Sequence, residues 1–333
     1  MKVLMIGGTG LISTAVVEES LHRGIDVFLL NRGKNKANFS RETHRFIADI
    51  NDEDAVEKVI GQHTFDVIVD FIAFKVEDVK RDYRLFKNKT KQYVFISSAS
   101  AYQKPLPKLP ITEDIPLDNK FWKYSQNKKY CEEFLLQIND PGFNVTIIRP
   151  SHTYSNKSLI FQLKSGKHPF TLIDRMLNHK PIIIPDDGLS KWTLTYHKDF
   201  AKGFVDVLGN KDTYQNYYHL TSEKVYTWNQ IVYSIYDALQ IKPHLIYIPT
   251  SEILKMFPEF EGELYGDKYE DAIFDNAKIK SVAPNYTSKT EYTSIVKQVI
   301  SYYLSHKEEQ TVDYDFIERY DKLIDNYKEW SHG

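Results

Sequence analysis

The chain has 333 residues, with 43 Lys plus Arg against 45 Asp plus Glu, so its formal net charge is -2. A chain of this length is too long for one ordinary core and fits two lobes, or one large domain with an appended subdomain. The near-zero charge disfavours a nucleic-acid partner held by bulk electrostatics. With 42% apolar and 26% charged residues, the composition is that of a globular chain rather than a disordered one.

Cys131 is the single cysteine, so the chain can form no internal disulfide and offers no cluster of thiolate metal ligands. We therefore predict no metal site and expect a reducing compartment, the cytoplasm. The apolar stretch over 3–17 is interrupted by glycines and followed by Glu18 and Glu19, which does not fit a signal peptide. Because no run of about 18 apolar residues occurs, we expect no membrane partner.

The first half of the chain alternates short apolar runs with amphipathic stretches, which is typical of successive βαβ units that build a parallel sheet. Several of the apolar runs show no alternation, as expected when helices cover both faces of a sheet. The pattern therefore predicts an α/β fold with a doubly wound parallel sheet. The expected strands are 2–6, 26–30, 45–47, 65–72, 93–97 and 144–148, and the expected helices are 11–23, 52–60, 75–87 and 119–138.

After Pro150 this regular alternation weakens, and Gly, Pro and Asp punctuate the chain. We expect residues 1–155, completed by parts of 193–222, to form the first domain, and residues 156–333 to form a smaller lobe with the C-terminal helices. In this second half the expected helices are 198–208, 228–239, 292–304 and an amphipathic helix around 316–327, and the expected strands are 214–220 and 245–248.

A glycine-rich segment directly follows the first strand and opens the first helix, the context that a dinucleotide-binding fingerprint requires. Its glycines permit a tight turn and let backbone N–H groups approach a pyrophosphate, whose negative charge the helix N-terminus favours. Ser13 stands where a third glycine is usual. A plain strand-to-helix turn is the alternative. The predicted cofactor-binding residues of this segment are Gly7, Gly8, Thr9, Gly10, Leu11 and Ile12.

The end of the second strand carries basic residues where an NAD-specific site usually has an acid for the ribose hydroxyls. Asn31 is followed by Arg32 and Lys34, with Lys36 nearby. These cationic donors suit the additional 2′-phosphate of NADP. Solvated basic residues in an exposed loop are the competing explanation. The sequence thus favours NADP as cofactor, with NAD as the alternative.

The pattern Tyr-x-x-x-Lys occurs three times, as chance allows in a chain with 23 tyrosines. Only Tyr124 and Lys128 lie on a predicted helix that follows a serine-rich strand end, and Ser98 in that strand end lies 26 positions before Tyr124. Here the chain resembles the extended branch of the short-chain dehydrogenase/reductase superfamily, the NAD(P)-dependent epimerase/dehydratase group. In that group a serine precedes a Tyr-x-x-x-Lys helix at about this distance.

The resemblance implies a Rossmann-type sheet with a smaller C-terminal α/β substrate lobe. Ser13 and Arg32 depart from the family pattern, so the chain resembles a divergent member. A homodimer mediated by helices is common in this family. The further cofactor-binding residues that the resemblance implies are Asp49, Ile50, Phe71, Ile72, Ala73 and Pro150.

Residues four apart on a helix share a face, so Tyr124 and Lys128 can reach one cavity. An ammonium about 4 Å from the phenolate would stabilise it by about 4 kcal/mol at an effective dielectric of about 20. We therefore expect Tyr124 to act as general base, with Lys128 as its cationic neighbour and Ser98 hydrogen-bonded to the substrate oxygen. The expected function is an NAD(P)-dependent epimerase or reductase for a nucleotide sugar or similar polar metabolite. The alternative is a non-catalytic regulatory or RNA-binding relative of the same fold.

Overall fold

The computed structural model describes residues 1–34 and 37–332, and the chain folds into two compact units. Unit 1 contains Met1–Thr153, Thr195–Glu223 and Phe274–Lys289, and unit 2 contains Tyr154–Leu194, Lys224–Ile273 and the chain from Thr290 onward. Each unit is therefore built from three separate segments of the sequence.

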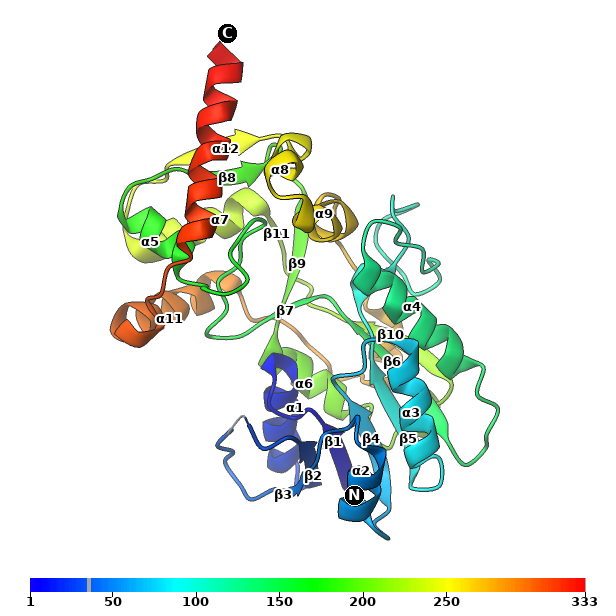
Figure 1. Cartoon of the computed structure of the whole chain (residues 1–333). Helices are drawn as coiled ribbons and strands as arrows, with labels where there is room; N and C mark the ends of the chain where they lie inside the picture. The colour runs from blue at the N-terminus through cyan, green and yellow to red at the C-terminus, as the bar shows by residue number, and fades with distance from the viewer. Residues whose placement is uncertain (35–36, 333) are drawn as a thin grey trace. The chain divides into compact units, whose positions relative to one another are not determined.

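Unit 1 is built on a seven-stranded sheet with the order β10-β6-β5-β4-β1-β2-β3 (Figure 1). Every strand pair in it is parallel, with β1 paired to β2 on one side and to β4 on the other. This arrangement confirms the predicted doubly wound parallel sheet. The strands are β1 (Lys2–Ile6), β2 (Asp26–Asn31), β3 (His44–Ile47), β4 (Phe65–Asp70), β5 (Thr90–Ile96), β6 (Asn144–Pro150) and β10 (Asn216–Leu220).

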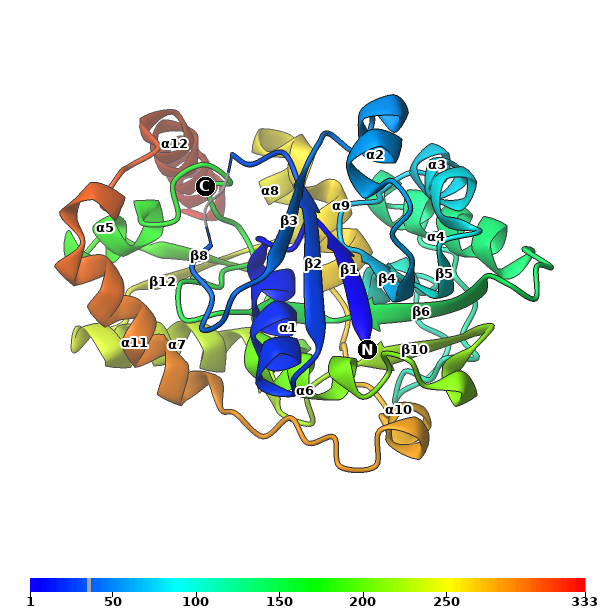
Figure 2. The same cartoon turned by 90° about the horizontal axis from the view of Figure 1, so that it is seen from below.

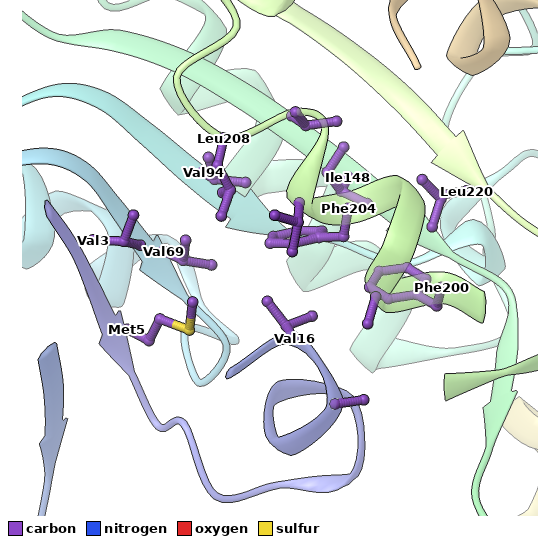
Figure 3. Packing of buried hydrophobic residues seen from close by; sticks show 14 of the residues in the cluster. Val3, Met5, Val16, Val69, Val94, Ile148, Phe200, Phe204, Leu208 and Leu220 are labelled. Atoms are coloured by element: carbon purple, nitrogen blue, oxygen red, sulfur yellow. The ribbon is translucent and has the colours of Figure 1, made fainter. Parts of the chain in front are cut away.

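Helices cover both faces of this sheet, which explains why its strands are apolar without alternation (Figure 2). In β1, Val3 and Met5 belong to the core shared with α1 (Leu11–His22) and α6 (His197–Val205), shown in Figure 3. Leu4 and Ile6 point to the opposite face. The helices on that face are α2 (Glu53–Ile60), α3 (Val76–Phe86) and α4 (Lys123–Leu136), and α10 (Ala277–Val282) packs with α1 and α6.

The predicted elements of unit 1 agree with the structure to within about one helical turn at their ends, apart from the start of α4. That helix was expected from residue 119 but begins at Lys123. Asn119 explains the difference, because its side chain donates to the carbonyl of Ser100 at 2.7 Å and accepts from the backbone N–H of Phe121 at 3.1 Å. These bonds hold the segment before α4 in a non-helical connection.

Unit 2 is a smaller α/β assembly, and its strands contribute to a two-stranded sheet and to a three-stranded sheet of order β11-β9-β7, in which β7 is His152–Tyr154. Strand β8 (Ile182–Pro185) pairs in parallel with β12 (Leu245–Ile248), and β9 (Lys191–Tyr196) pairs antiparallel with β11 (Val225–Thr227). β8 was not among the predicted strands, because Pro181 precedes it and Pro185 ends it. Among the described residues, no helix combines the length and apolar character that a membrane span requires. The other elements that carry the argument are α5 (Thr171–Leu177), α7 (Trp228–Leu239), α8 (Thr250–Met256), the π-helix η4 (Leu264–Lys268), α11 (Tyr292–Ser305) and α12 (Tyr314–His332).

Candidate active site

The glycine-rich turn after β1 is tightly packed and closed by a serine. Gly7 has φ +81°, and a Cβ there would lie 2.4 Å from Cγ2 of Ile72. Ser13, which is buried, accepts from the backbone N–H of Gly10 at 2.8 Å and donates to the carbonyl of Gly7 at 3.0 Å. The hydroxyl that replaces the usual third glycine therefore braces the loop. The first-turn N–H groups of α1 have no acceptor within the helix, which leaves them available to an anion.

A cavity of about 580 Å³ opens beside this turn, at the carboxyl ends of β1 to β4. Its volume lies in the range of small-molecule and cofactor sites. In a doubly wound fold, this edge of the sheet is where ligands bind. The residues that line it are Gly7, Thr9, Gly10, Leu30, Asn31, Arg32, Gly33, Lys34, Ala48, Asp49, Ile50, Asn51, Ile72, Phe74, Lys75, Asp78 and Arg81.

Some predicted cofactor residues lie outside this cavity lining. Phe71 packs its ring 6.0 Å from that of Phe204 in the core, and Leu11 offers its carbonyl to His197 at 3.2 Å. Ala73 is buried, and Pro150 is buried at the end of β6. The remaining predicted residues outside the lining are Gly8 and Ile12, which pack against core side chains, and Lys36, which lies outside the described residues.

The two basic residues expected to select NADP do line the cavity. Arg32 places Nη1 4.0 Å from Oδ2 of Asp49, and both side chains are exposed. An exposed pair at this distance is weakly held, so Arg32 can turn toward another anion at little cost. Asn31 shapes the turn by accepting from the backbone N–H of Gly33 at 2.9 Å.

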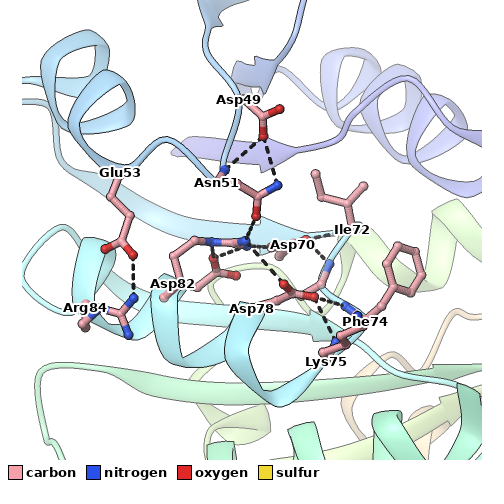
Figure 4. Close-up of polar contacts among 12 residues, drawn as sticks. Asp49, Asn51, Glu53, Asp70, Ile72, Phe74, Lys75, Asp78, Asp82 and Arg84 are labelled. Atoms are coloured by element: carbon pink, nitrogen blue, oxygen red, sulfur yellow. Dashed lines mark hydrogen bonds and ion pairs between the residues drawn. The ribbon is translucent and has the colours of Figure 1, made fainter. Parts of the chain in front are cut away.

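An unpredicted cluster of Arg81 and three aspartates braces the cavity floor (Figure 4). Arg81 donates to Asp82 at 2.8 Å and to Asn51, in the turn after β3, at 2.8 Å. Asp70, at the end of β4, accepts from the backbone N–H of Ala73 at 2.8 Å. Burial and the neighbouring Asp70 raise the pKa of Asp82 well above its usual value. The cluster thus ties together the two turns that form the cavity wall.

The sequence signal for this cluster was Asp70 itself, a carboxylate at the end of an otherwise apolar strand. A buried carboxylate needs partners, so such a residue indicates a polar network at the strand end. The partners on α3 could not be identified, because surface aspartates and arginines are common on an amphipathic helix.

Lys128 is buried on α4 behind the cavity. Its Nζ donates to the carbonyls of Ala73 at 2.8 Å and Ile96 at 2.7 Å. Burial lowers the pKa of Lys128 to about 8, although nearby Asp70 and other groups oppose that shift. The ammonium lies over the ring of Tyr124, 5.7 Å from its centroid, so the two predicted catalytic residues are brought together.

Ser98 is linked to the same helix through a chain of hydroxyl groups. It caps the short 3-10 helix η1 (Ala99–Ala101), with its Oγ 2.8 Å from Oγ of Ser100. Ser100 in turn lies 2.8 Å from Oγ of Ser125, the neighbour of Tyr124 on α4. Either oxygen of each pair can be the donor, so the Ser98 hydroxyl is free to donate to a further acceptor. Sequence reasoning missed Ser100 and Ser125, since serines in a turn and on a helix carry no distinctive spacing.

Residues 3–84 and 83–220 match the model of the NAD dependent epimerase/dehydratase family. The chain belongs to this family. Chloroplast stem-loop binding protein of 41 kDa b from Arabidopsis thaliana is 29% identical over 242 residues, which cover 68% of this chain and 60% of that protein. UDP-glucose 4-epimerase from Lactobacillus helveticus is 33% identical over 170 residues, 45% of this chain and 51% of that protein. The chain thus spans about half to three fifths of the length of these relatives.

Solved structures of epimerases share the fold of this epimerase/dehydratase family member. UDP-glucose 4-epimerase from Bifidobacterium longum, in complex with NAD+ and UDP, superposes with a TM-score of 0.72 at 18% identity, covering 93% of this chain and 100% of that chain. Epimerase Mth375 from Methanothermobacter thermautotrophicus gives a TM-score of 0.73 at 14% identity, covering 92% and 93%. At sequence identities of 14% and 18%, the structural similarity establishes the fold alone.

In this family member the helix of Tyr124 is anchored by a buried ion pair. Glu132 on α4 accepts from Arg149 on β6 at 2.6 Å, and both side chains are almost fully buried. Arg149 also donates to the hydroxyl of Tyr102 at 3.2 Å, which lies 3.0 Å from Nδ1 of His219. Burial lowers the pKa of His219 to about 4, so the imidazole is neutral at pH 7. This network holds α4, and with it Tyr124, against the sheet.

Proposed function

We propose that the chain is an NAD(P)-dependent epimerase or reductase that acts on a hydroxyl or carbonyl group of a nucleotide sugar or similar polar metabolite. The observation that best supports this proposal concerns Phe74. Its side chain lines the cavity beside the glycine-rich turn and also contacts Tyr124 and Lys128. Its ring centroid lies 6.3 Å from that of Tyr124 and 4.8 Å from Nζ of Lys128. One side chain thus joins the cofactor cavity to the candidate general base.

The residues of the cavity fit a dinucleotide. Gly7 leaves no room for a Cβ beside Ile72, and the cationic side chains of Arg32 and Lys34 line the cavity. A bound nicotinamide dinucleotide supplies a hydride acceptor that can return the hydride. The chain's own part is acid–base chemistry: Tyr124 takes the proton from a substrate hydroxyl, and Ser98 donates a hydrogen bond to the same oxygen. The ammonium of Lys128 favours the phenolate. The reverse proton transfer accompanies carbonyl reduction.

Replacement of Tyr124 by Phe tests this assignment. We expect turnover of UDP-glucose, the substrate named for the Lactobacillus relative, to fall by about 10²- to 10⁴-fold, the usual contribution of a general base. Affinity for the dinucleotide should stay unchanged. Tyr130→Phe, an exposed tyrosine on the same helix, is the matched control. Turnover that survives in Tyr124→Phe would refute the catalytic role.

The cofactor preference is proposed to be NADP, because Arg32 and Lys34 offer donors for the 2′-phosphate. Titration calorimetry with NADPH and NADH should show tighter NADPH binding, reduced about 10-fold or more in Arg32→Ala with NADH unaffected. The Bifidobacterium longum epimerase structure contains NAD+, and tighter binding of NADH than of NADPH is the outcome that would assign NAD instead. The stoichiometry then separates the activities: an epimerase recycles its cofactor, whereas a reductase consumes it.

A second candidate function, RNA binding, is favoured by the similarity to a protein named as a stem-loop binding protein. Phosphate-mediated RNA binding weakens steeply with salt. Titration of a stem-loop RNA at two salt concentrations, with the dinucleotide present and absent, tests it. Salt-sensitive binding combined with no turnover would replace the enzymatic proposal.

A further inference from the structure

Lys128 places an ammonium group in the interior of unit 1. Its side chain is almost fully buried on α4, and Nζ donates to the carbonyls of Ala73 and Ile96. In the part of the chain that the structure describes, the nearby carboxylates act on Lys128 through space and accept no hydrogen bond from it. Taking an ammonium out of water is unfavourable unless other groups stabilise its charge. The titratable groups around Lys128 are Asp70, Asp78, Tyr124, Cys131 and Glu132.

Two phenylalanine rings face this ammonium at close range. Nζ of Lys128 lies 4.7 Å from the ring centroid of Phe95 and 4.8 Å from that of Phe74. The face of an aromatic ring carries partial negative charge and attracts a cation within about 6 Å, more strongly where water is excluded. The ring of Tyr124, at 5.7 Å, also lies within this range. The rings therefore supply the negative charge density that a carboxylate supplies in an ion pair.

The rings and the hydrogen-bond acceptors come from the same two places in the chain. Ala73 and Phe74 are consecutive in the connection between β4 and α3, and Ile96 follows Phe95 at the end of β5. Because β4 and β5 are neighbouring parallel strands, each strand end contributes one carbonyl and one ring to Lys128. The phenylalanine side chains take no part in the two hydrogen bonds, so either ring can be replaced without removing an acceptor.

Core packing accounts for one of these rings better than for the other. Phe95 is fully buried and belongs to the hydrophobic core on the α4 side of the sheet. Phe74 is 46% exposed and lines the cavity beside the glycine-rich turn. A half-exposed ring gains less free energy from burial than a fully buried one. The ring contacts that the structure gives Phe74 are with Lys128 and Tyr124, so its position indicates a contact with the ammonium rather than a packing role.

We propose that Phe74 and Phe95 form an aromatic cage that keeps the ammonium of Lys128 charged beside Tyr124. Both are positioning residues, because they act on the proposed general base through Lys128. A charged ammonium favours the phenolate of Tyr124, whereas a neutral amine does not. The role of the cage in catalysis rests on the proposed function. The charge state of Lys128 does not depend on that function and can be measured directly.

The titration of Lys128 tests the cage without any turnover. Lysine isotopically labelled at Cε gives an NMR signal that follows protonation of Nζ, and the signal missing in Lys128→Met is that of Lys128. Burial lowers the pKa of Lys128 to about 8, so its midpoint is accessible. We expect this midpoint to fall by about one pH unit in Phe95→Leu and in Phe74→Leu, because leucine has no aromatic face. Phe74→Tyr keeps the ring and should leave the midpoint unchanged.

Phe134→Leu is the matched control, since Phe134 lies on the same helix as Lys128 but its ring faces Lys80, 5.6 Å away. The midpoint of Lys128 should not change in this variant. A midpoint that stays the same or rises in the leucine variants would overturn the cage. Circular dichroism shows which variants are folded. Phe74 is half-exposed, so Phe74→Leu decides the question where the core variant Phe95→Leu does not fold.

Kinetics separates failure of the cage from failure of the proposed function. With the midpoint lowered by about one pH unit, the charged fraction of Lys128 at pH 8 falls from about one half to about one tenth. In Phe95→Leu, whose side chain lies outside the cavity lining, kcat at pH 8 should therefore fall about 5-fold with little change in KM. Phe74→Tyr should keep the kcat of the unaltered chain.

An unaltered chain that does not turn over UDP-glucose counts against the proposed function, while the NMR titration still decides on the cage. Turnover by the unaltered chain, combined with an unchanged midpoint in Phe74→Leu and Phe95→Leu, counts against the cage alone.

Discussion

Lys128 in unit 1 and Lys164 in unit 2 have the same lowered pKa of about 8, yet the charged groups near them act on that pKa in opposite directions. Burial is the main cause in both. Around Lys128 the nearby carboxylates oppose the shift, and the ammonium donates to two carbonyls. Around Lys164 a second lysine adds to the shift. A lowered pKa alone therefore does not define a role: Lys128 is held by completed hydrogen bonds, whereas Lys164 lies where positive charge is left over.

The largest expected effect separates the two lysines by kinetics. Lys128→Met removes the cation beside Tyr124, and we expect kcat to fall by about 10²-fold or more because the phenolate loses its stabilising charge. Lys164→Met should instead leave kcat nearly unchanged, because Lys164 donates to the carbonyl of Leu159 in unit 2 and has no part in the proposed acid–base step. Steady-state kinetics of both variants against one substrate measures this split. A fall in kcat with Lys164→Met would contradict the comparison.

Removing the carboxylate near each lysine should affect stability very differently. Glu132→Gln leaves the buried Arg149 without its partner, so we expect a loss of about 3–5 kcal/mol in the free energy of unfolding. Glu263, the partner of Lys268, has a side chain 39% exposed, so water reaches this pair, but Lys268 itself is buried. Glu263→Gln should therefore cost less, about 1–3 kcal/mol. Urea denaturation of both variants gives the two values. Equal losses would show that the two carboxylates are equally coupled to their units.

Much of unit 1 could be predicted from the sequence because its signals are local. The Gly7 turn, the apolar strands and the spacing of Tyr124 and Lys128 each lie within one or two adjacent elements. Arg81 and its aspartates could not be predicted, since their meeting depends on the register of α3 against the ends of β3 and β4.

Unit 2 was less predictable because more of its features depend on contacts between elements that are far apart in the sequence. The strand β8 lies between prolines and acquires its pairing only from β12, more than fifty residues later in the chain. Lys164 and Lys268 are likewise far apart in the sequence, and the sequence around each of them does not distinguish it from a surface lysine. Only the folded chain shows that they share one carboxylate.

The pH dependence sharpens the comparison further. Both lysines have a pKa of about 8, so each loses its proton above that pH. We expect kcat to decline above about pH 8 as Lys128 becomes neutral. In Lys128→Met this decline of kcat above pH 8 should disappear, whereas Lys164→Met should retain it.

The smallest expected effect concerns the free energy of unfolding. We expect Lys164→Met to raise it and Lys128→Met to lower it. The folded-state pKa of Lys164 is below its unfolded value of 10.5, so the folded state disfavours the charged form below pH 8 and gains stability as pH rises from 8 to 10.5. At pH 7, Lys164→Met should therefore stabilise the chain slightly, by about 1 kcal/mol or less, by removing the like charge. Lys128→Met should destabilise it by about 1–3 kcal/mol, because the carbonyls of Ala73 and Ile96 lose their donor. Thermal denaturation at pH 7 and pH 9 measures both, and the gain from Lys164→Met should shrink at the higher pH. Destabilisation by Lys164→Met at pH 7 would mean that the contacts of Lys164 in the folded chain outweigh the cost of its buried charge.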